Sequence, residues 1–526
     1  MIFISILTLI VAKALPSLYS NLSSTYFTRI SAIIFIYAGV LSFNTFYIQS
    51  IGSGIGLYSG LFQITQVSVL IEVFFLLIGF LILIAWPIYT GNSNKNILNK
   101  DYSLIVLFST LGSCLLVSSS DLISMYLSIE LQSFGLYVLS TLYRDSESST
   151  SAGLKYFLLG GLSSCLILLG CGVIYSLTGL TNFESIYSII STSSVNYIIQ
   201  GLSLGLLFII IGFLFKIAAA PLHNWAPDVY DDTPTIVTIW LTIMPKISII
   251  ILLIELVELG TIGSTNSLNI SSYNNILNSL LEINSMYLIK NLLLITSLLS
   301  LIIGTVVGLA QTRIKRLLAY STISHVGFIL LALAINTEQS IDSLIFYIIQ
   351  YTITNLNIFL ILIGLSYIIY NKNILNKEGN YLGDIKYISS LKGQFFLNPL
   401  LSLSLCTCLF SMAGIPPLIG FFSKQFVLYS AIESGYYFMA FIAILVSVVS
   451  ASYYLKIIKV LQIEDENNLS ELEINSQEMK EKGEILLSNF HSFVISTLTL
   501  FILLFILKPS LILNITQLIS LSLFKF

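Results

Sequence analysis

Long apolar stretches separated by short polar segments occupy almost the whole chain. A stretch of about 20 apolar residues is long enough to cross a lipid bilayer as a helix. Such stretches lie near residues 1–15, 28–48, 66–90, 103–119, 122–143, 152–178, 201–227, 234–259, 290–311, 316–336, 341–370, 395–430, 436–460 and 488–507. This pattern predicts an all-α polytopic membrane protein with about 14 transmembrane helices.

Lysine and arginine are concentrated in the connections that follow the odd-numbered helices of this set. These connections hold, or lie beside, Arg29, Lys95, Lys100, Arg144, Lys155, Arg313, Lys315, Arg316, Lys372, Lys377, Lys386, Lys392, Lys456, Lys459, Lys480 and Lys482. The even-numbered connections are mainly acidic, with Lys290 as a basic exception. Because loops on the cytoplasmic side of a membrane are enriched in Lys and Arg, the odd connections should share one face. Both chain ends are then expected on the opposite face.

Two prolines inside apolar stretches mark an internal repeat. A shift of 195 residues (416 − 221) places Pro221 on Pro416, and it also places Tyr156 on Tyr351. Each repeat holds five helices, and an odd number of helices inverts the second copy in the membrane. The expected fold therefore contains two inverted five-helix repeats, in which helices 7 and 12 are broken at the prolines.

The repeat divides the chain into five parts. We expect three N-terminal transmembrane helices (1–90), a first repeat (103–259), a second repeat (290–460), a charged linker (461–487) and a C-terminal transmembrane helix (488–526). The first apolar run is expected to be a membrane helix and not a cleavable leader.

Composition supports a membrane protein and argues against redox chemistry within the chain. Only 9% of the residues are charged, whereas soluble domains contain about 25%. The cysteines form no CxxC pair, and His223, His325 and His491 match no haem or zinc pattern. The sequence also lacks a dinucleotide-binding fingerprint. We therefore expect no cofactor and no metal in this chain.

Four charged residues lie deep inside apolar stretches: Glu130, Lys216, Lys246 and Lys424. A lysine at bilayer depth costs roughly 2.5–3.5 kcal/mol on insertion scales, so it is rarely retained without a use. The alternative for Lys216, a side chain that extends to the membrane surface, is disfavoured by the long apolar flanks on both sides. Since a buried lysine can exchange a proton near neutral pH and an arginine cannot, these residues are candidate proton carriers.

Histidines near these positions allow two interpretations. His325 is either a proton relay on the same line or a histidine hydrogen-bonded between helices, and the sequence does not separate the two. His223, Trp225 and Asp228 follow the first proline break. They are expected to satisfy the freed backbone groups and to anchor the interface more than to carry protons.

Two blocks of sequence resemble a known family. FKIAAAPLHNWAPDVYDDTPTIVTIWLTIMPK and KRLLAYSTISHVGF are similar to the antiporter-like subunits of respiratory complex I, a family that includes subunits of multi-subunit sodium/proton antiporters. The resemblance implies fourteen helices in two inverted units. It also implies that Glu130 and Lys216 form the charge pair of helices 5 and 7, with Lys246 on helix 8 and Lys424 on helix 12. Some members carry glutamate at the position of Lys424.

The resemblance carries expectations about function. It implies a proton-translocating membrane-arm subunit of the mitochondrial NADH:ubiquinone oxidoreductase, with NADH, FMN, iron–sulfur clusters and ubiquinone in other subunits. A composition rich in Ile, Leu, Asn, Tyr and Phe is typical of an AT-rich organelle genome and favours the mitochondrial inner membrane. The expected partners are other membrane-arm subunits and lipids, with no nucleic acid. The alternatives are a subunit of a multi-subunit sodium/proton antiporter and a purely structural scaffold.

Overall fold

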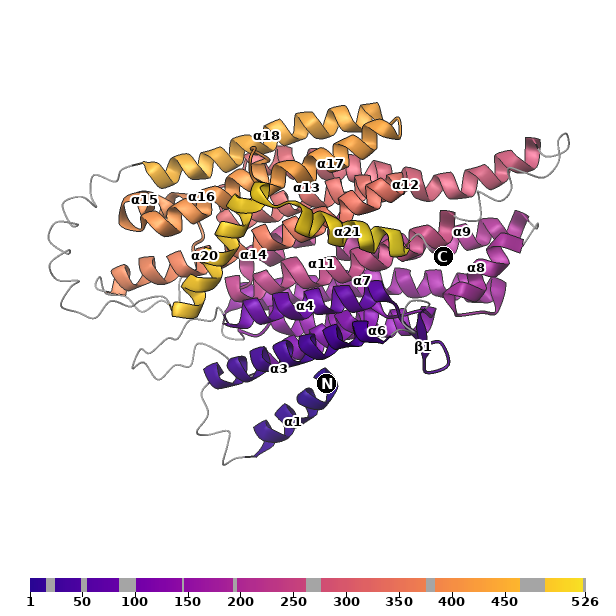
Figure 1. Ribbon diagram of the computed structural model, residues 1–526, viewed down its shortest axis with the longest axis horizontal. Helices are drawn as coiled ribbons and strands as arrows, with labels where there is room; N and C mark the ends of the chain where they lie inside the picture. Colours follow the sequence, from indigo (N-terminus) through magenta and orange to yellow (C-terminus); the bar gives the residue numbers. More distant parts are fainter. Residues whose placement is uncertain are drawn as a thin grey trace.

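The structure of the chain is a computed structural model. It describes residues 1–15, 24–48, 54–84, 101–143, 146–192, 196–261, 276–374, 384–463 and 488–523. The helices run mostly side by side along one common direction (Figure 1). Most of the predicted charged linker 461–487 lies outside the described residues.

Helices make up nearly all of the described secondary structure. The N-terminal part contains α1 (Ile2–Ala14), α3 (Ser24–Asn44) and α4 (Gln66–Ile84). The next part contains α5 (Tyr102–Val117), α6 (Leu122–Ser140), α7 (Glu147–Thr178), α8 (Phe183–Thr192), α9 (Asn196–Lys216), α10 (Trp225–Asp232) and α11 (Thr235–Thr261). It is followed by α12 (Ile276–Leu309), α13 (Ile314–Ile335), α14 (Glu338–Ile374), α15 (Gln394–Leu397), α16 (Pro399–Ala413), α17 (Ile419–Glu433) and α18 (Tyr437–Gln462). The chain then forms α20 (Asn489–Leu504) and α21 (Ser510–Leu523).

The prediction of an all-helical membrane protein is confirmed. Among the described residues, 10 helices are long and apolar enough to cross a membrane, and shorter apolar helices accompany them. Three of the long helices form the centre of the molecule: the apolar windows of α11 and α13 are 94% buried and that of α14 is 89% buried. By contrast, only 39% of the window of α7 or α18 is buried. Polar side chains on α11, α13 and α14 are therefore shielded from lipid by other helices.

A small hairpin lies where only a connection was expected. Strands β1 (Ile55–Leu57) and β2 (Phe62–Ile64) pair antiparallel, with Gly56 opposite Gln63. The backbone N–H of Gln63 donates to Ser118 O, at the end of α5. The strands are too short to give a period-two pattern that the sequence could reveal. The hairpin covers the connection between α5 and α6 and so fixes the start of α6.

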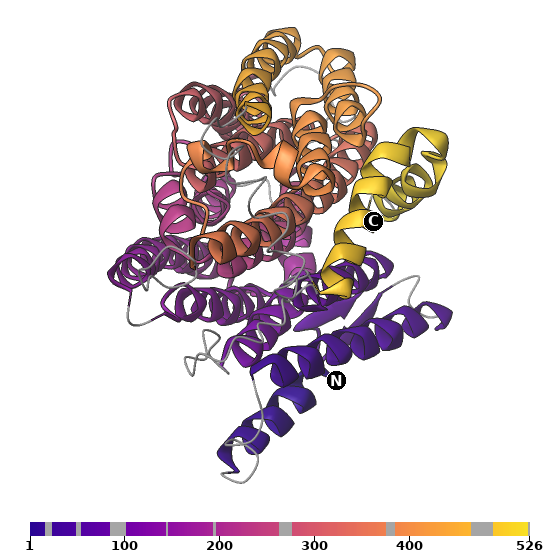
Figure 2. The same cartoon turned by 90° about the vertical axis from the view of Figure 1, so that its left-hand side faces the viewer.

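The C-terminal apolar segment forms two helices and not the single helix expected from its hydrophobicity. A short 3₁₀ turn, Phe505–Leu507, follows α20, and Pro509 precedes α21. Proline is well tolerated at a helix start because its missing N–H has no partner there. The two helices lie along the side of the bundle, where both contact α14 and α4 (Figure 2).

Close helix contacts at glycine recur in both halves of the molecule. A Cβ atom added at Gly112 of α5 would lie 2.6 Å from the backbone N of Gln132 in α6. A Cβ atom added at Gly304 of α12 would lie 2.7 Å from the backbone N of Ser324 in α13. The two contacts are related by a shift of 192 residues (304 − 112, and equally 324 − 132). The first helix pairs of the two halves therefore superimpose at a shift of 192 residues. The prolines superimpose at a shift of 195, so the two shifts differ by about one helical turn.

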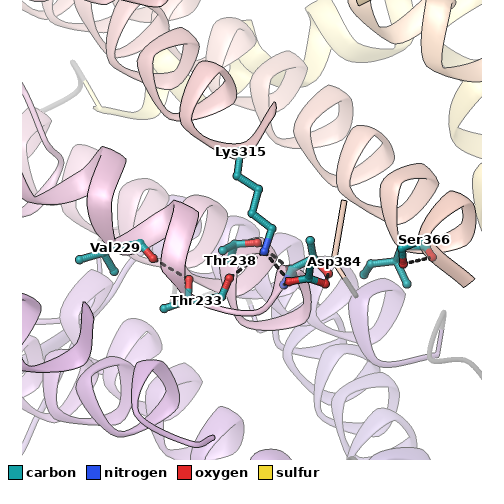
Figure 3. Close-up of polar contacts among 8 residues, drawn as sticks. Val229, Thr233, Thr238, Lys315, Ser366 and Asp384 are labelled. Carbon is teal, nitrogen blue, oxygen red and sulfur yellow. Dashed lines mark hydrogen bonds and ion pairs between the residues drawn. The ribbon is translucent and has the colours of Figure 1, made fainter. Parts of the chain in front are cut away.

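Ion pairs join the two halves at one end of the bundle. The buried Lys315 at the start of α13 binds the Asp384 carboxylate and donates a 2.8 Å hydrogen bond to Thr233 O (Figure 3). The same carboxylate accepts the backbone N–H and the hydroxyl of Thr235, at the first turn of α11. These residues belong to the connections after helices 7, 9 and 11 of the sequence-based count. These three odd-numbered connections therefore meet at one end, which agrees with the shared face expected from their charges.

A further pair fixes the same end. Arg313 donates to Asp231 at 2.6 Å, and the hydrogen bond and charge of Asp231 raise the pKa of Arg313 further above its ordinary value. Arg316 and Lys155 both bind Asp228. These contacts hold α10, just beyond the first helix break, against α13 and α7.

The glycine contact at position 112 gives a prediction about stability. Gly112→Ala should destabilise the folded chain by about 1–3 kcal/mol, because the new methyl group meets backbone atoms that cannot move independently. Gly172→Ala on α7 is the matched control, since nothing lies within 4 Å of a Cβ atom there. The control should be neutral or should stabilise by about 0.5–1 kcal/mol. Thermal unfolding of the two variants in detergent checks this, and equal melting temperatures would count against the close α5–α6 packing.

Candidate functional site

The first break lies where α9 ends at Lys216 and α10 begins at Trp225. Between them Ala218 has a positive φ of 62°, and Pro221 lacks an N–H, so the helical hydrogen bonds stop. The indole N–H of Trp225 donates to Phe215 O at 2.9 Å. His223 Nδ1 lies 3.2 Å from Pro221 O. Trp225 thus satisfies a backbone group near the break, the role expected from the sequence.

Lys216 forms an ion pair with Glu130 of α6. The distance between Lys216 Nζ and Glu130 Oε1 is 3.3 Å, and the two side chains are 8% and 15% exposed. The Ser133 hydroxyl, one turn further along α6, lies 3.4 Å from Glu130 Oε2. The structure therefore brings together the two residues that the sequence placed 86 positions apart.

A small cavity adjoins this pair. It has a volume of about 10 Å³, close to the least space that a water molecule needs. Its lining includes Gln132, Ser133, Tyr137, Tyr156, Lys216 and Trp225. The rings of Tyr156 and Trp225 are stacked, with centroids 4.7 Å apart. The cavity places a few polar groups, among them those of Gln132 and Ser133, beside the ammonium group of Lys216 in a mainly apolar lining.

Lys246 lies on α11 next to Pro245, in the centre of the molecule. It is only 2% exposed, and its Nζ donates to the hydroxyl of Tyr351 on α14 at 3.2 Å. On the same helix, Ser248 exchanges hydrogen bonds of 2.9 and 3.1 Å with the amide of Gln132 on α6. The Gln132–Ser248 contact joins the helix of Glu130 to the helix of Lys246.

The second break separates α16 from α17. Gly414, with φ 86°, ends α16, and the chain reaches α17 through Pro416 and Pro417. Lys424, on α17, donates hydrogen bonds of 2.9 Å to Met412 O and Ala413 O. These carbonyls are at the C-terminal end of α16, the negative end of the helix dipole. The broken helix itself thus provides the counter-dipole for this buried cation.

The two lysines lie on opposite sides of their helix breaks. Lys216 is the last residue of α9, before the break, whereas Lys424 lies after the break and reaches back across it. Neither Lys246 nor Lys424 forms an ion pair with a carboxylate in the part of the chain that the structure describes. Of the predicted charged residues, only Glu130 and Lys216 are in direct contact.

His325 of α13 lies between two tyrosine hydroxyls and is 4% exposed. Its Nδ1 is 2.7 Å from Tyr347 Oη on α14, and its Nε2 is 3.3 Å from Tyr454 Oη on α18. It is therefore hydrogen-bonded between helices, one of the two interpretations of the sequence. That arrangement is also what a relay needs, because both ring nitrogens have hydroxyl neighbours.

The analysis of charged residues missed the tyrosines. Tyr347 and Tyr351 are four residues apart on α14, so they share one face of that helix. The signal was a regular series of polar residues within an apolar helix, in which Asn355 takes the next position. Within the described residues, no group of three or more His, Cys, Asp or Glu side chains could hold a metal ion.

Comparisons with known proteins agree on one family. Residues 119–269 and 261–450 match the family model described as NADH:quinone oxidoreductase/Mrp antiporter, TM. The chain is 49% identical to NADH-ubiquinone oxidoreductase chain 2 of Rhizopus oryzae over the whole of both chains. It is 32% identical to NADH-quinone oxidoreductase subunit N of Pelagibacter ubique, over 96% of this chain and 95% of the other.

A solved structure shows the same fold. The similar chain belongs to respiratory complex I from Thermus thermophilus, with a TM-score of 0.69 and 24% identity over 98% of this chain and 99% of the other. The fold and the full-length sequence identity therefore support the same family assignment, and the broken helices and buried charges agree with it. The chain belongs to the antiporter-like membrane subunits of complex I, in the family of NADH-ubiquinone oxidoreductase chain 2.

Proposed function

We propose that this chain moves protons across the mitochondrial inner membrane along the line Glu130, Lys216, Lys246, His325 and Lys424. It does so as a membrane-arm subunit of NADH:ubiquinone oxidoreductase, coupled to electron transfer in other subunits. The buried ion pair between Lys216 and Glu130 at the end of α9 is the observation that carries the proposal. A cation and a carboxylate on separate helices can approach and part, and each arrangement favours a different protonation state of the lysine.

The energetic scale suits a driven cycle. One elementary charge that crosses a potential of about 180 mV gains or loses roughly 4 kcal/mol. Closing or opening a buried ion pair changes the free energy of a proton by a similar amount, since breaking such a pair costs roughly 3–5 kcal/mol. Small movements of α6 against α9 are then sufficient to load and unload Lys216.

The proposal includes the topology. The ten long helices, together with α1, α5, α9 and α16, give fourteen crossings, with α10 and α17 completing the two broken ones. The parts are three N-terminal helices (1–90), inverted five-helix units (103–259 and 290–460) and the C-terminal segment (488–526). The recurrence of the glycine contacts and of the two breaks supports the inverted repeat.

Other subunits complete the proposed machine. NADH, FMN, iron–sulfur clusters and ubiquinone bind elsewhere in the assembly, and neighbouring membrane-arm subunits and lipids cover this chain. The relatives are named as chains or subunits of an oxidoreductase, which supports this assignment. It also favours complex I over the sodium/proton antiporter alternative. NADH oxidation by the purified native assembly tests the choice.

Lys216→Ala should lower proton pumping by on the order of tenfold or more while the assembly still forms, because the site loses its proton carrier. Lys216→Arg should fail as well, since arginine stays protonated. Proton uptake driven by NADH in sealed vesicles measures both. Lys459→Ala, at an exposed position of α18, is the control and should pump normally. Normal pumping by correctly assembled Lys216→Ala would sink the proposal.

Glu130→Gln should be nearly as damaging as Lys216→Ala, because the amide carries no charge to stabilise the ammonium group. Glu130→Asp should be milder, since it keeps the charge at a shorter reach. Pumping rates of the two variants in the assembled complex check the difference. If Gln and Asp behaved alike, charge would not be what matters at this position, and the pair would lose its proposed role.

Lys424→Glu should retain part of the pumping activity, whereas Lys424→Leu should lose most of it. A buried carboxyl group can also exchange a proton, and some family members have glutamate at this position. Leucine has no group that binds a proton, although it inserts into the membrane more readily. Both variants are measured for proton uptake and for NADH:ubiquinone reductase rate. Pumping by Lys424→Leu at the rate of the unmodified chain would place Lys424 outside the proton path.

A further inference from the structure

We propose that the hydroxyls of Tyr351 and Tyr347, on either side of His325, relay protons between Lys246 and Lys424. The inference rests on the proton line proposed above and assigns the groups that connect its second half. It arises because the charged residues alone leave this part of the line discontinuous. Lys246 and Lys424 have no carboxylate partner among the described residues, and no contact between them is seen.

The first link is the contact of Lys246 with Tyr351. Two tyrosine rings pack around the ammonium group at almost equal distance, with the Tyr230 centroid at 5.7 Å and the Tyr351 centroid at 5.6 Å. Only the Tyr351 hydroxyl is hydrogen-bonded to the lysine, at 3.2 Å. The Tyr230 hydroxyl is buried and makes no hydrogen bond within the described residues. Tyr351 is therefore the acceptor for a proton that leaves Lys246.

The second link is the histidine. The His325 ring lies beside both tyrosines, with its centroid 5.9 Å from that of Tyr351 and 5.9 Å from that of Tyr347. The 2.7 Å contact of Nδ1 with Tyr347 Oη is the shorter of its two hydrogen bonds. The three side chains come from α13 and α14, which are almost wholly buried. The Nε2 atom faces Tyr454 Oη, and the Tyr351 hydroxyl donates to Thr242 O at 3.4 Å, so no direct hydrogen bond joins Tyr351 to His325. The two rings are neighbours, and a proton passes from Tyr351 to His325 in this proposal when the Tyr351 hydroxyl turns to Nε2 or through one water molecule.

The third link runs beside Phe328. The ring of Phe328 stacks on Tyr347 with centroids 5.8 Å apart, and Lys424 Nζ lies 5.7 Å from the Phe328 centroid. Phe328, which carries no proton, thus neighbours both Tyr347 and Lys424, and no hydrogen bond between Tyr347 and Lys424 is found among the described residues. Transfer from Tyr347 to Lys424 in this proposal therefore passes beside the Phe328 ring and needs a side-chain movement or a water molecule to close the gap.

The proton balance is simple. A proton leaves Nζ of Lys246 for Oη of Tyr351, as the phenol proton of Tyr351 passes to the imidazole of His325. The imidazole passes a proton through Oη of Tyr347 to Nζ of Lys424, which starts as the neutral amine. At the end Lys246 is an amine and Lys424 is an ammonium group. Both tyrosines and His325 have returned to their starting charges, and the tautomer of His325 and the directions of the hydroxyl protons are reset by rotation before the next proton; no oxidant or cofactor takes part.

The test compares phenylalanine variants in the assembled complex in sealed vesicles. Tyr351→Phe keeps the ring beside Lys246 and removes the bonded hydroxyl, whereas Tyr230→Phe keeps a ring at the same distance and removes a hydroxyl outside the relay. We expect proton pumping in Tyr351→Phe to fall by about tenfold, less than the roughly 10²–10⁴-fold of full acid–base loss because water can replace a hydroxyl. Its rate in D₂O should fall further than that of the unmodified complex. Tyr230→Phe should match the unmodified complex in both respects.

Further variants keep the outcomes distinct. Tyr347→Phe removes the 2.7 Å contact with His325 and should also slow pumping, which provides a second test if Tyr351→Phe does not assemble. Normal pumping in either relay variant, or equal losses in Tyr351→Phe and Tyr230→Phe, would overturn the relay. Lys246→Ala separates the two proposals. If Lys246→Ala loses proton pumping while Tyr351→Phe pumps normally, the line of charged residues stands without the tyrosine relay. If Lys246→Ala pumps normally, the line of charged residues itself is wrong.

Discussion

An ammonium group can remain within a membrane only if something other than water solvates it, and the structure depends on how this is done. Lys216 is held by the carboxylate of Glu130, and Lys424 by the last carbonyls of α16. The second solution requires a helix that stops inside the molecule, because an intact helix uses its carbonyls internally. The break before Pro416 is therefore part of the binding of Lys424, and the break before Pro221 ends α9 directly after Lys216.

The rest of the architecture supports those breaks. The central helices α11, α13 and α14 are buried on nearly all sides, which allows them to carry a lysine, a histidine and tyrosines without exposure to lipid. Ion pairs of Asp384 and Asp231 clamp the ends of α10 and α11 to α13, so that the segment after the first break has a fixed position.

The sequence predicted the charged positions and the breaks because each involves a residue type that apolar helices rarely tolerate. Glu130, Lys216, Lys246 and Lys424 stand out for this reason, as does Pro221. Tyr347 and Tyr351 do not stand out, since tyrosine is common in membrane helices and its hydroxyl matters only when rotation of the helix directs it at a partner. The sequence also did not reveal that residues 488–526 form two helices, or that the two halves superimpose at a shift of 192 residues near the glycines and 195 at the prolines. Apolar sequence matches itself at several shifts, and only the contacts of Gly112 and Gly304 fix one.

The central claim is that Glu130 and Lys216 act as one unit, and a double-mutant cycle measures this directly. Glu130→Gln, Lys216→Gln and the double variant are compared with the unmodified complex for NADH-driven proton uptake. If the pair is a unit, either change already removes its function, and the double variant should pump no more slowly than the slower single variant. If the two losses instead multiply, the residues act independently, and the ion pair seen at 3.3 Å is not the element that moves protons.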